Sequence, residues 1–130
     1  MSSFRLPGEM GTTMSDATPA LHEVWRIAFE YEDQPSVVKE RPVVVGAIDD
    51  EILVVLAVKV TGHGPRKEFA GEVRLADWAE AGLDKPSVVR CSKTLLVPAR
   101  AFEGQLRYGR LSQEDALAVD AALREVGATL

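Results

Sequence analysis

The sequence predicts a single α+β domain, a small barrel-like sheet with one amphipathic helix near the C-terminus. Valine-rich runs on both sides of a polar turn near residue 50 are too rich in β-branched residues for helices and predict two buried strands. After residue 112, apolar residues recur instead at helical spacing. The chain has 130 residues, 46% of them hydrophobic, which fits one core rather than two domains.

The N-terminal part is predicted to be a tail, a strand and a loop. Residues 1–20 are rich in Ser, Thr, Gly, Pro and Met and lack an apolar period, which predicts a disordered tail before one folded domain of residues 21–130. From Val24 to Tyr31, apolar residues alternate with others, as is typical of a half-buried strand. We expect a polar loop from Glu32 to Glu40, of a length that often borders a site.

The centre of the chain is predicted to be a hairpin of two buried strands. The apolar runs Val43–Val45 and Ile52–Val60 flank a polar turn at residues 49–51. Arg41 enters the first strand and Thr61 leaves the second, and both are roughly equally far from the turn. In an antiparallel hairpin these two side chains return to the same end of the sheet, where a cation and a hydroxyl form a plausible anion site.

The following residues predict shorter elements. Two glycines and a proline make residues 62–65 a loop, and alternation from Phe69 to Leu75 predicts a fourth strand. Residues 76–81 have the pattern of a single helical turn with Gly82 as its C-cap. Residues 87–97 are predicted to form two short strands or one bent strand.

The C-terminal helix has the clearest signals. Ser112 is a good N-cap, and the acidic Asp115 follows three residues later. The helix ends at Gly127. The apolar residues expected to face the sheet are Ala116, Val119, Leu123 and Val126.

Composition restricts the location and the partners. A single cysteine, Cys91, excludes an internal disulfide and, without a secretory signal, favours the cytoplasm. The longest apolar run, residues 52–58, is too short to span a bilayer, so no membrane partner is expected. The net charge of −5 argues against a general nucleic-acid coat. Residues 75–111 hold six basic and four acidic side chains, which makes them the best place for a polyanion unless these are ordinary solvated charges.

Four stretches of the chain, spread over residues 22–126, together form a pattern of motifs in a defined order and spacing. They are Val24–Phe29, Lys39–Val45, Val60–Thr61, and a last group made of 77–78, 82–83, 85–90 and 108–112. This order resembles the PemK/MazF-like toxins of bacterial toxin–antitoxin systems. The resemblance implies a small SH3-like barrel and an endoribonuclease that cuts single-stranded RNA without a metal or other cofactor. It also implies an antitoxin protein or peptide as partner, and a homodimer.

The resemblance implies that Arg41 and Thr61 are the catalytic residues. Transesterification of RNA needs charge stabilisation at the phosphate, and the Arg41 guanidinium offers a planar fork of donors that stays charged. The Thr61 hydroxyl is a donor to a phosphate oxygen. Two plainer interpretations stay open. Arg41 is also suited to an ion pair with Glu40 or Asp33, and threonine is common at strand ends.

The predicted reaction also needs a proton acceptor. His63 has a suitable side chain and lies between glycines two residues after Thr61, although a histidine in such a loop is often only a surface residue. We predict RNA-binding roles for Ser87, Arg90 and Lys93; Ser87 is equally suited to cap a turn. Histidine and cysteine spacing gives no metal site.

The sequence leaves a second function open. The same barrel, without catalysis, is suited to bind a peptide or another protein, and the acidic net charge favours this alternative. Cleavage of RNA by the purified protein distinguishes the two hypotheses.

Overall fold

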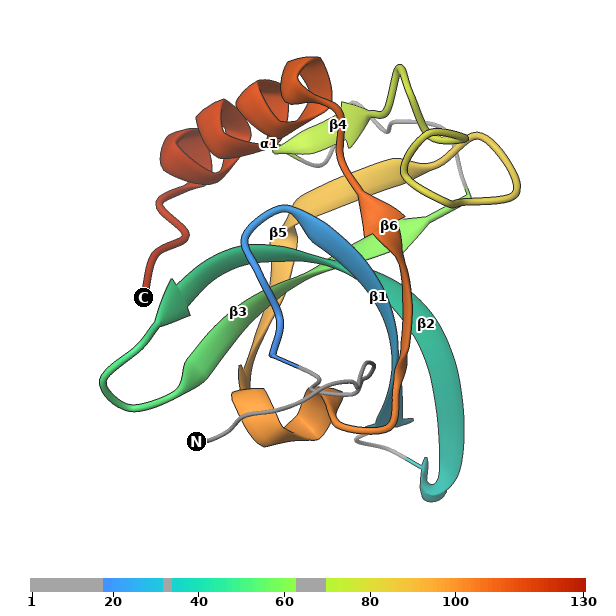
Figure 1. The fold of residues 1–130 in the computed structure, drawn as a ribbon, viewed down its shortest axis with the longest axis vertical. Coiled ribbons are helices and arrows are strands. Elements are labelled where there is room, and N and C mark those ends of the chain that lie inside the picture. The colour runs from blue at the N-terminus through green and yellow to red at the C-terminus, as the bar shows by residue number, and fades with distance from the viewer. Residues whose placement is uncertain (1–17, 32–33, 63–69) are drawn as a thin grey trace, which may run out of the picture.

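The computed structural model describes residues 18–31, 34–62 and 70–130, and the predicted tail therefore lies mostly outside the described residues. The described strands form one six-stranded sheet in the order β4-β5-β3-β2-β1-β6, with every neighbouring pair antiparallel. The sheet curls into an open barrel, with α1 across its β4–β5 end (Figure 1). The predicted α+β class is confirmed. The elements are β1 (Glu23–Tyr31), β2 (Gln34–Asp49), β3 (Val54–Thr61), β4 (Glu72–Arg74), β5 (Val88–Pro98), η2 (Ala99–Phe102), β6 (Leu106–Arg110) and α1 (Gln113–Val126).

The central hairpin forms as predicted. In β2 and β3, Val43 pairs with Lys59 and Val45 pairs with Ala57. The turn between them is closed by the Asp49 side chain, whose Oδ1 accepts hydrogen bonds from two backbone amides of the turn at 3.0 and 3.3 Å. The strand after the turn begins at Val54 rather than at Ile52, because this turn occupies residues 50–53.

Alternation along the strands divides the apolar residues between two sides of the sheet. Trp25 and Ile27 of β1 belong to a cluster inside the curl, where the Trp25 and Phe102 rings meet edge to face with centroids 5.4 Å apart. Val24 belongs to the cluster on the other side, beneath α1. The hydrophobic pattern of β1 is therefore confirmed where its side chains are described.

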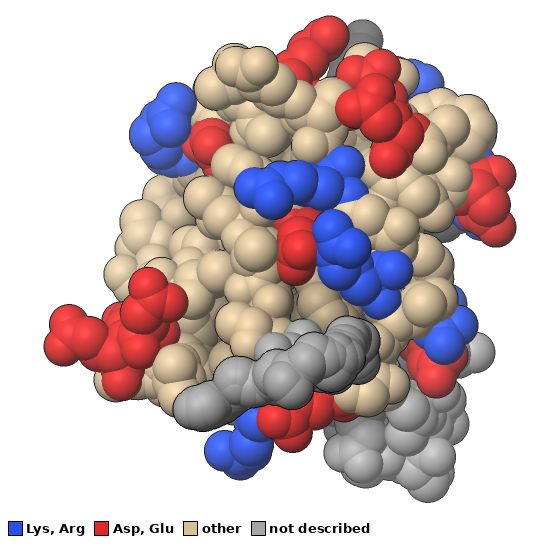
Figure 2. Space-filling model, in the orientation of Figure 1, with Lys and Arg blue, Asp and Glu red and all other residues tan. Residues whose placement is uncertain are grey.

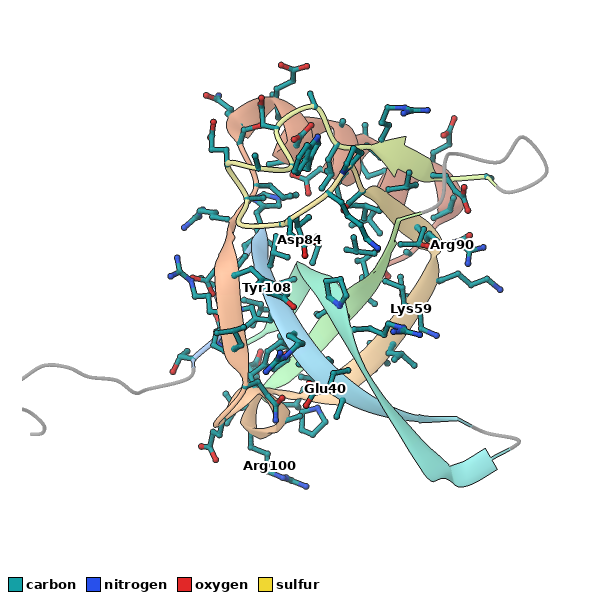
Figure 3. All side chains as sticks on the ribbon, turned by 90° about the vertical axis from the view of Figure 1, so that its right-hand side faces the viewer. Glu40, Lys59, Asp84, Arg90, Arg100 and Tyr108 are labelled. Carbon is teal, nitrogen blue, oxygen red and sulfur yellow. The ribbon has the colours of Figure 1, made fainter. Side chains whose placement is uncertain are left out.

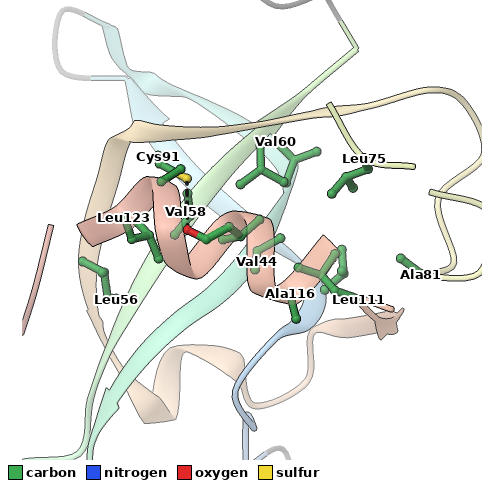
Figure 4. Packing of buried hydrophobic residues seen from close by; sticks show 14 residues of the cluster. Val44, Leu56, Val58, Val60, Leu75, Ala81, Cys91, Leu111, Ala116 and Leu123 are labelled. Atoms are coloured by element: carbon green, nitrogen blue, oxygen red, sulfur yellow. Dashed lines mark hydrogen bonds between the residues drawn. The ribbon is translucent and has the colours of Figure 1, made fainter. Parts of the chain in front are cut away.

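The predicted helix covers this second cluster. Val119 and Leu123 of α1 are 0% and 5% exposed and pack with Val58 of β3. The Cys91 thiol lies in the same cluster, 3.9 Å from the carbonyl oxygen of Val119 (Figure 4). Figure 4 shows the helix lying across the strands, so that its apolar stripe closes this side of the core.

Both ends of α1 are capped as predicted. The Ser112 Oγ accepts a hydrogen bond from the backbone amide of Asp115 at 3.2 Å. Gly127 ends the helix with φ of 74°, and the amides of residues 127 and 128 donate to the carbonyls of Arg124 and Leu123. This is a Schellman ending.

Two segments differ from the sequence-based prediction. The prediction of a polar loop over Glu32–Glu40 is wrong for residues 34–40, which form the first part of β2. These residues pair with β1, from Gln34 opposite Tyr31 to Glu40 opposite Ala28. Their polar composition does not predict a strand. The strand forms because its backbone groups pair with those of β1, which would otherwise be unpaired. The other edge of β1 pairs with β6, a strand that was not predicted because its residues show no apolar alternation.

Two further observations complete the fold. Of the two alternatives predicted for residues 87–97, the single bent strand is the one found: β5 runs over residues 88–98, with an irregularity in its register opposite Val58 and Lys59. Within the described residues, none of the helices has the length and apolar character needed to cross a membrane.

Candidate functional site

A cleft of about 540 Å³ opens at the rim of the sheet where the pairing of β2 with β3 ends. Four parts of the chain line it: residues 41–42 of β2, residues 60–62 at the end of β3, residues 82–85 and 87 of the loop before β5, and Tyr108 of β6. These parts are distant in the sequence. The fold therefore gathers polar side chains that no local motif connects.

The structure places Arg41 and Thr61 in the same cleft. Thr61 pairs with Val88 at the end of β3, and Arg41 pairs with Ile27, so both backbones are fixed by the sheet. Thr61 is half-buried and Arg41 is exposed, so the guanidinium is accessible to an anion. Within the described ranges no carboxylate forms a salt bridge with Arg41.

The alternative interpretation of Arg41, as an ion-pair partner of Glu40, is not supported by the geometry. The Glu40 carboxylate pairs with Arg26 of β1, with 3.4 Å between Oε1 and Nε. Neighbouring residues of a strand point to opposite faces of the sheet, so Glu40 and Arg41 are directed apart. The other suggested partner, Asp33, lies outside the described residues.

The remaining predicted residues have different positions. Ser87 lines the cleft and is buried, and its Oγ donates to the carbonyl oxygen of Lys85 at 2.9 Å, so it does cap a turn. Arg90 lies outside the cleft lining, and its Nε donates to Glu72 Oε2 at 2.8 Å. Lys93 is exposed on β5, also away from the lining. His63 lies outside the described residues.

Lys85 is a second cation in the cleft; it belongs to the basic segment 75–111 of the sequence but was not among the predicted catalytic or RNA-binding residues. A Cβ added at Gly62 would lie 2.9 Å from the Lys85 Cε and 3.2 Å from its Nζ. The amino end of Lys85 therefore lies against Gly62, the residue that follows Thr61. Arg41 and Lys85 thus place two cations in the lining that holds the Thr61 hydroxyl.

Asp84 and Tyr108 add a carboxylate and a phenol to the same cleft. In Figure 3, Asp84 hangs from the loop and Tyr108 extends from β6 toward the same space. Asp84 is exposed and Tyr108 is half-buried. Among the described residues no hydrogen bond or salt bridge is formed by the Asp84 carboxylate, so the fold gives it no structural partner.

The loop that carries Asp84 and Lys85 is anchored on the α1 side by Asp115. This carboxylate is 2% exposed, and its two oxygens accept hydrogen bonds from the backbone amides of Ala76 and Asp77 at 2.9 and 2.8 Å. The sequence suggested Asp115 only as part of a helix cap. Its side chain instead ties the first turn of α1 to a loop almost forty residues away.

The other end of the loop is anchored on β6. Residues 78–83 close a helical turn with the predicted C-cap, in which the Gly82 amide donates to Ala79 and the Leu83 amide donates to Trp78. Gly82 has φ of +91°, and a Cβ there would lie 2.2 Å from the carbonyl oxygen of Tyr108. Only glycine permits this backbone contact. The position of Asp84 relative to Tyr108 is therefore set by the loop's contact with β6.

The charges of the cleft differ from those of the chain as a whole. Two cations, Arg41 and Lys85, face one carboxylate, Asp84, in a lining of eleven residues, although the whole chain carries −5. On the face drawn in Figure 2, acidic and basic side chains are interspersed rather than separated into single-sign fields. A cleft with a local positive surplus is therefore compatible with an acidic protein.

In the described part of the chain, a curled antiparallel sheet, the covering helix α1 and a cleft with two cations at the sheet rim define a small α+β protein with a candidate anion site. The model of the PemK-like, MazF-like toxins of type II toxin–antitoxin systems matches residues 22–127, and the chain belongs to this family. No curated protein sequence matches the chain.

Several solved structures have a similar fold. MazE–MazF (form III) from Deinococcus radiodurans is 16% identical with a TM-score of 0.65, and the match covers 87% of this chain and 99% of that one. An endoribonuclease in complex with its cognate antitoxin from a mycobacterial species is 14% identical with a TM-score of 0.63, covering 86% and 98%. The Mycobacterium tuberculosis toxin MazF-mt6 is 25% identical with a TM-score of 0.55, covering 79% and 94%.

Proposed function

We propose that this toxin-family chain is an endoribonuclease that cuts single-stranded RNA by attack of a 2′-hydroxyl on the adjacent phosphate, without a metal ion. The observation that carries the proposal is the presence of Arg41, Thr61 and Lys85 in the lining of one cleft. Two cations and a hydroxyl are suited to a phosphodiester, whose charge grows as the 2′-oxygen adds to phosphorus.

Each of these residues has a role that follows from its chemistry. The Arg41 guanidinium stabilises the two non-bridging oxygens through parallel N–H donors. Lys85, beside Gly62, adds a compact charge from the loop. The Thr61 hydroxyl donates to a phosphate oxygen and helps to fix the phosphate relative to the strand end. The P–O5′ bond breaks, which gives a 2′,3′-cyclic phosphate and a 5′-hydroxyl end.

The other predicted residues have supporting roles in the proposal. Ser87 shapes the cleft through its bond to the Lys85 carbonyl. Arg90 and Lys93 of β5 are proposed to contact RNA beyond the cleft, where Arg90 is positioned by Glu72. His63 remains a predicted catalytic residue, two positions after Thr61, the last residue of β3.

The partners and the location are proposed from the family. Two of the similar structures contain an antitoxin, and we propose that an antitoxin protein also restrains this chain. We further propose that the chain forms a homodimer and acts in the cytoplasm, where single-stranded RNA is available.

The test uses purified protein and a long single-stranded RNA in EDTA, comparing wild type with Arg41→Ala and Arg100→Ala. Arg100 is the matched control, because it is an exposed arginine on η2 at the end of the molecule far from Asp84 (Figure 3). Loss of one phosphate-stabilising donor typically costs about 10²–10³-fold in rate. We expect that loss for Arg41→Ala and near-normal cleavage for Arg100→Ala.

Two results oppose the proposal. Intact RNA with the wild-type protein at all concentrations favours the alternative, a barrel that binds a protein or peptide without catalysis. Undiminished cleavage by Arg41→Ala places the reaction elsewhere. Growth of bacteria after induction gives a second readout: the wild-type chain arrests growth, and Arg41→Ala does not.

A further inference from the structure

The proposed reaction needs a group that removes the proton of the 2′-hydroxyl, and most of the cleft lining is unsuited to this. Arg41 and Lys85 hold their protons as cations, and the Thr61 and Ser87 hydroxyls are weak bases. The Ser87 hydroxyl also donates to the Lys85 carbonyl. Among the described residues of the lining, the carboxylate of Asp84 is the one ionised acceptor.

The location of Asp84 meets the geometric requirement for such a group. It shares the cleft with both cations and the Thr61 hydroxyl, and in Figure 3 it points into the cleft from the loop, with Tyr108 across the same space. A proton acceptor must approach the 2′-oxygen from a side different from the groups that hold the phosphate oxygens. Asp84 comes from the loop, whereas Arg41 and Thr61 come from the strands. Lys85 follows Asp84 in the loop, but its amino end lies against Gly62, beside Thr61 at the end of β3.

Both ends of the loop that carries Asp84 are anchored to the rest of the fold. Asp115 anchors the loop start through two backbone amides, and the Gly82 contact with Tyr108 anchors the turn two residues before Asp84. The amide of Leu75 also donates to the carbonyl oxygen of Ser87 at 3.0 Å, which closes the loop at its base. Fixed loop ends reduce the reorganisation that a catalytic carboxylate needs before reaction.

We propose that Asp84 is the proton acceptor of the cleavage reaction, an inference that rests on the proposed function. A carboxylate oxygen of Asp84 takes the 2′-hydroxyl proton while the 2′-oxygen forms its bond to phosphorus. The P–O5′ bond breaks, and the leaving 5′-oxygen takes a proton from a water molecule in the open cleft. Protonated Asp84 then returns its proton to water, so that no net proton is gained or lost.

The first test measures single-turnover cleavage of a short RNA with one mapped site by wild type, Asp84→Asn and Glu80→Gln. Glu80 is the matched control, because it is an exposed carboxylate of the same loop outside the cleft lining. Loss of a general base typically slows a reaction by about 10²–10⁴-fold. We expect this for Asp84→Asn, a rate within about twofold of wild type for Glu80→Gln, and an unchanged thermal midpoint for both.

A second test separates proton removal from substrate binding and from proton donation. RNA with a 2′-deoxy nucleotide at the cleaved position should bind Asp84→Asn and wild type equally well. RNA with sulfur in place of the 5′-bridging oxygen needs no proton on its leaving group, so the loss of rate in Asp84→Asn relative to wild type should be as large with this substrate as with ordinary RNA. If Asp84→Asn cleaves this substrate as fast as the wild type does, the assignment is overturned, because Asp84 would then be a donor.

The outcomes distinguish this inference from the proposed function. If wild type cleaves and loses activity with Arg41→Ala but Asp84→Asn cleaves normally, the proton acceptor is another group and only this inference fails. A His63→Ala protein that loses the activity while Asp84→Asn retains it leads to the same conclusion. An inert wild-type protein overturns both.

Discussion

Asp115 provides a stability prediction whose magnitude follows from the contacts. Its side chain is 2% exposed and accepts hydrogen bonds from the amides of Ala76 and Asp77 at 2.9 and 2.8 Å. Hydrogen bonds to a charged group contribute about 1.5–3 kcal/mol each, and a buried donor left unpaired costs about 1–3 kcal/mol. Because the loop donors can partly turn to water, we expect Asp115→Ala to lower the free energy of unfolding by about 3 kcal/mol.

Two variants isolate the cause of this loss. Asp115→Asn keeps one carbonyl acceptor, so its loss should be about half as large. Glu114→Gln also removes a negative charge from the first turn of α1 but leaves the loop bonds intact, since Glu114 is exposed. Only the interaction with the helix dipole is lost there, about 0.5 kcal/mol.

Equilibrium unfolding in urea, followed by tryptophan fluorescence and by circular dichroism, gives these free energies. A loss below about 1 kcal/mol for Asp115→Ala shows that the loop amides find equal partners without it. Equal losses for Asp115→Ala and Glu114→Gln show that charge at the helix end, rather than anchoring of the loop, is responsible.

Gly82→Ala should be more damaging than Gly104→Ala, because both glycines have positive φ but only at Gly82 would the new Cβ collide with the backbone, 2.2 Å from the Tyr108 oxygen. We expect about 1 kcal/mol lost for Gly104→Ala from strain alone, and clearly more for Gly82→Ala together with slower RNA cleavage; equal losses in urea unfolding contradict this. Burial, helped by the negative charge of Asp120, raises the pKa of the Cys91 thiol to about 11. Maleimide should therefore label Cys91 slowly in the folded protein and quickly after denaturation, and stability should fall as pH rises from the usual 9.0 to about 11; fast labelling of the folded protein contradicts the burial.

The parts of the fold that could be predicted are those whose signal is local. Alternation in β1, the valine runs of the central hairpin and the capped helix each bury one face, and burial selects the residue types that the sequence displays. The continuation of β2 over residues 34–40 and the strand β6 form mainly because β1 supplies unpaired backbone groups on both edges. Backbone pairing leaves little trace in polar side chains.

The candidate site likewise has a part that the sequence predicts and a part that it does not. The proximity of Arg41 and Thr61 could be predicted from the sequence, because the register of a hairpin relates residues on either side of one turn. The positions of Lys85 and Asp84 in the cleft could not be predicted in this way. They depend on a long-range contact from Asp115 to the loop and on the approach of Gly82 to Tyr108. No spacing along the chain encodes such contacts.

The chemical ends of the RNA fragments test the central claim most directly, that the cleft directs a 2′-hydroxyl at a phosphate held by Arg41 and Thr61. Mass spectrometry of fragments made by the wild-type protein in EDTA should find a 2′,3′-cyclic phosphate on one side of the cut and a 5′-hydroxyl on the other. Fragments that carry a 3′-hydroxyl and a 5′-phosphate would mean that water is the attacking group, and would contradict the account.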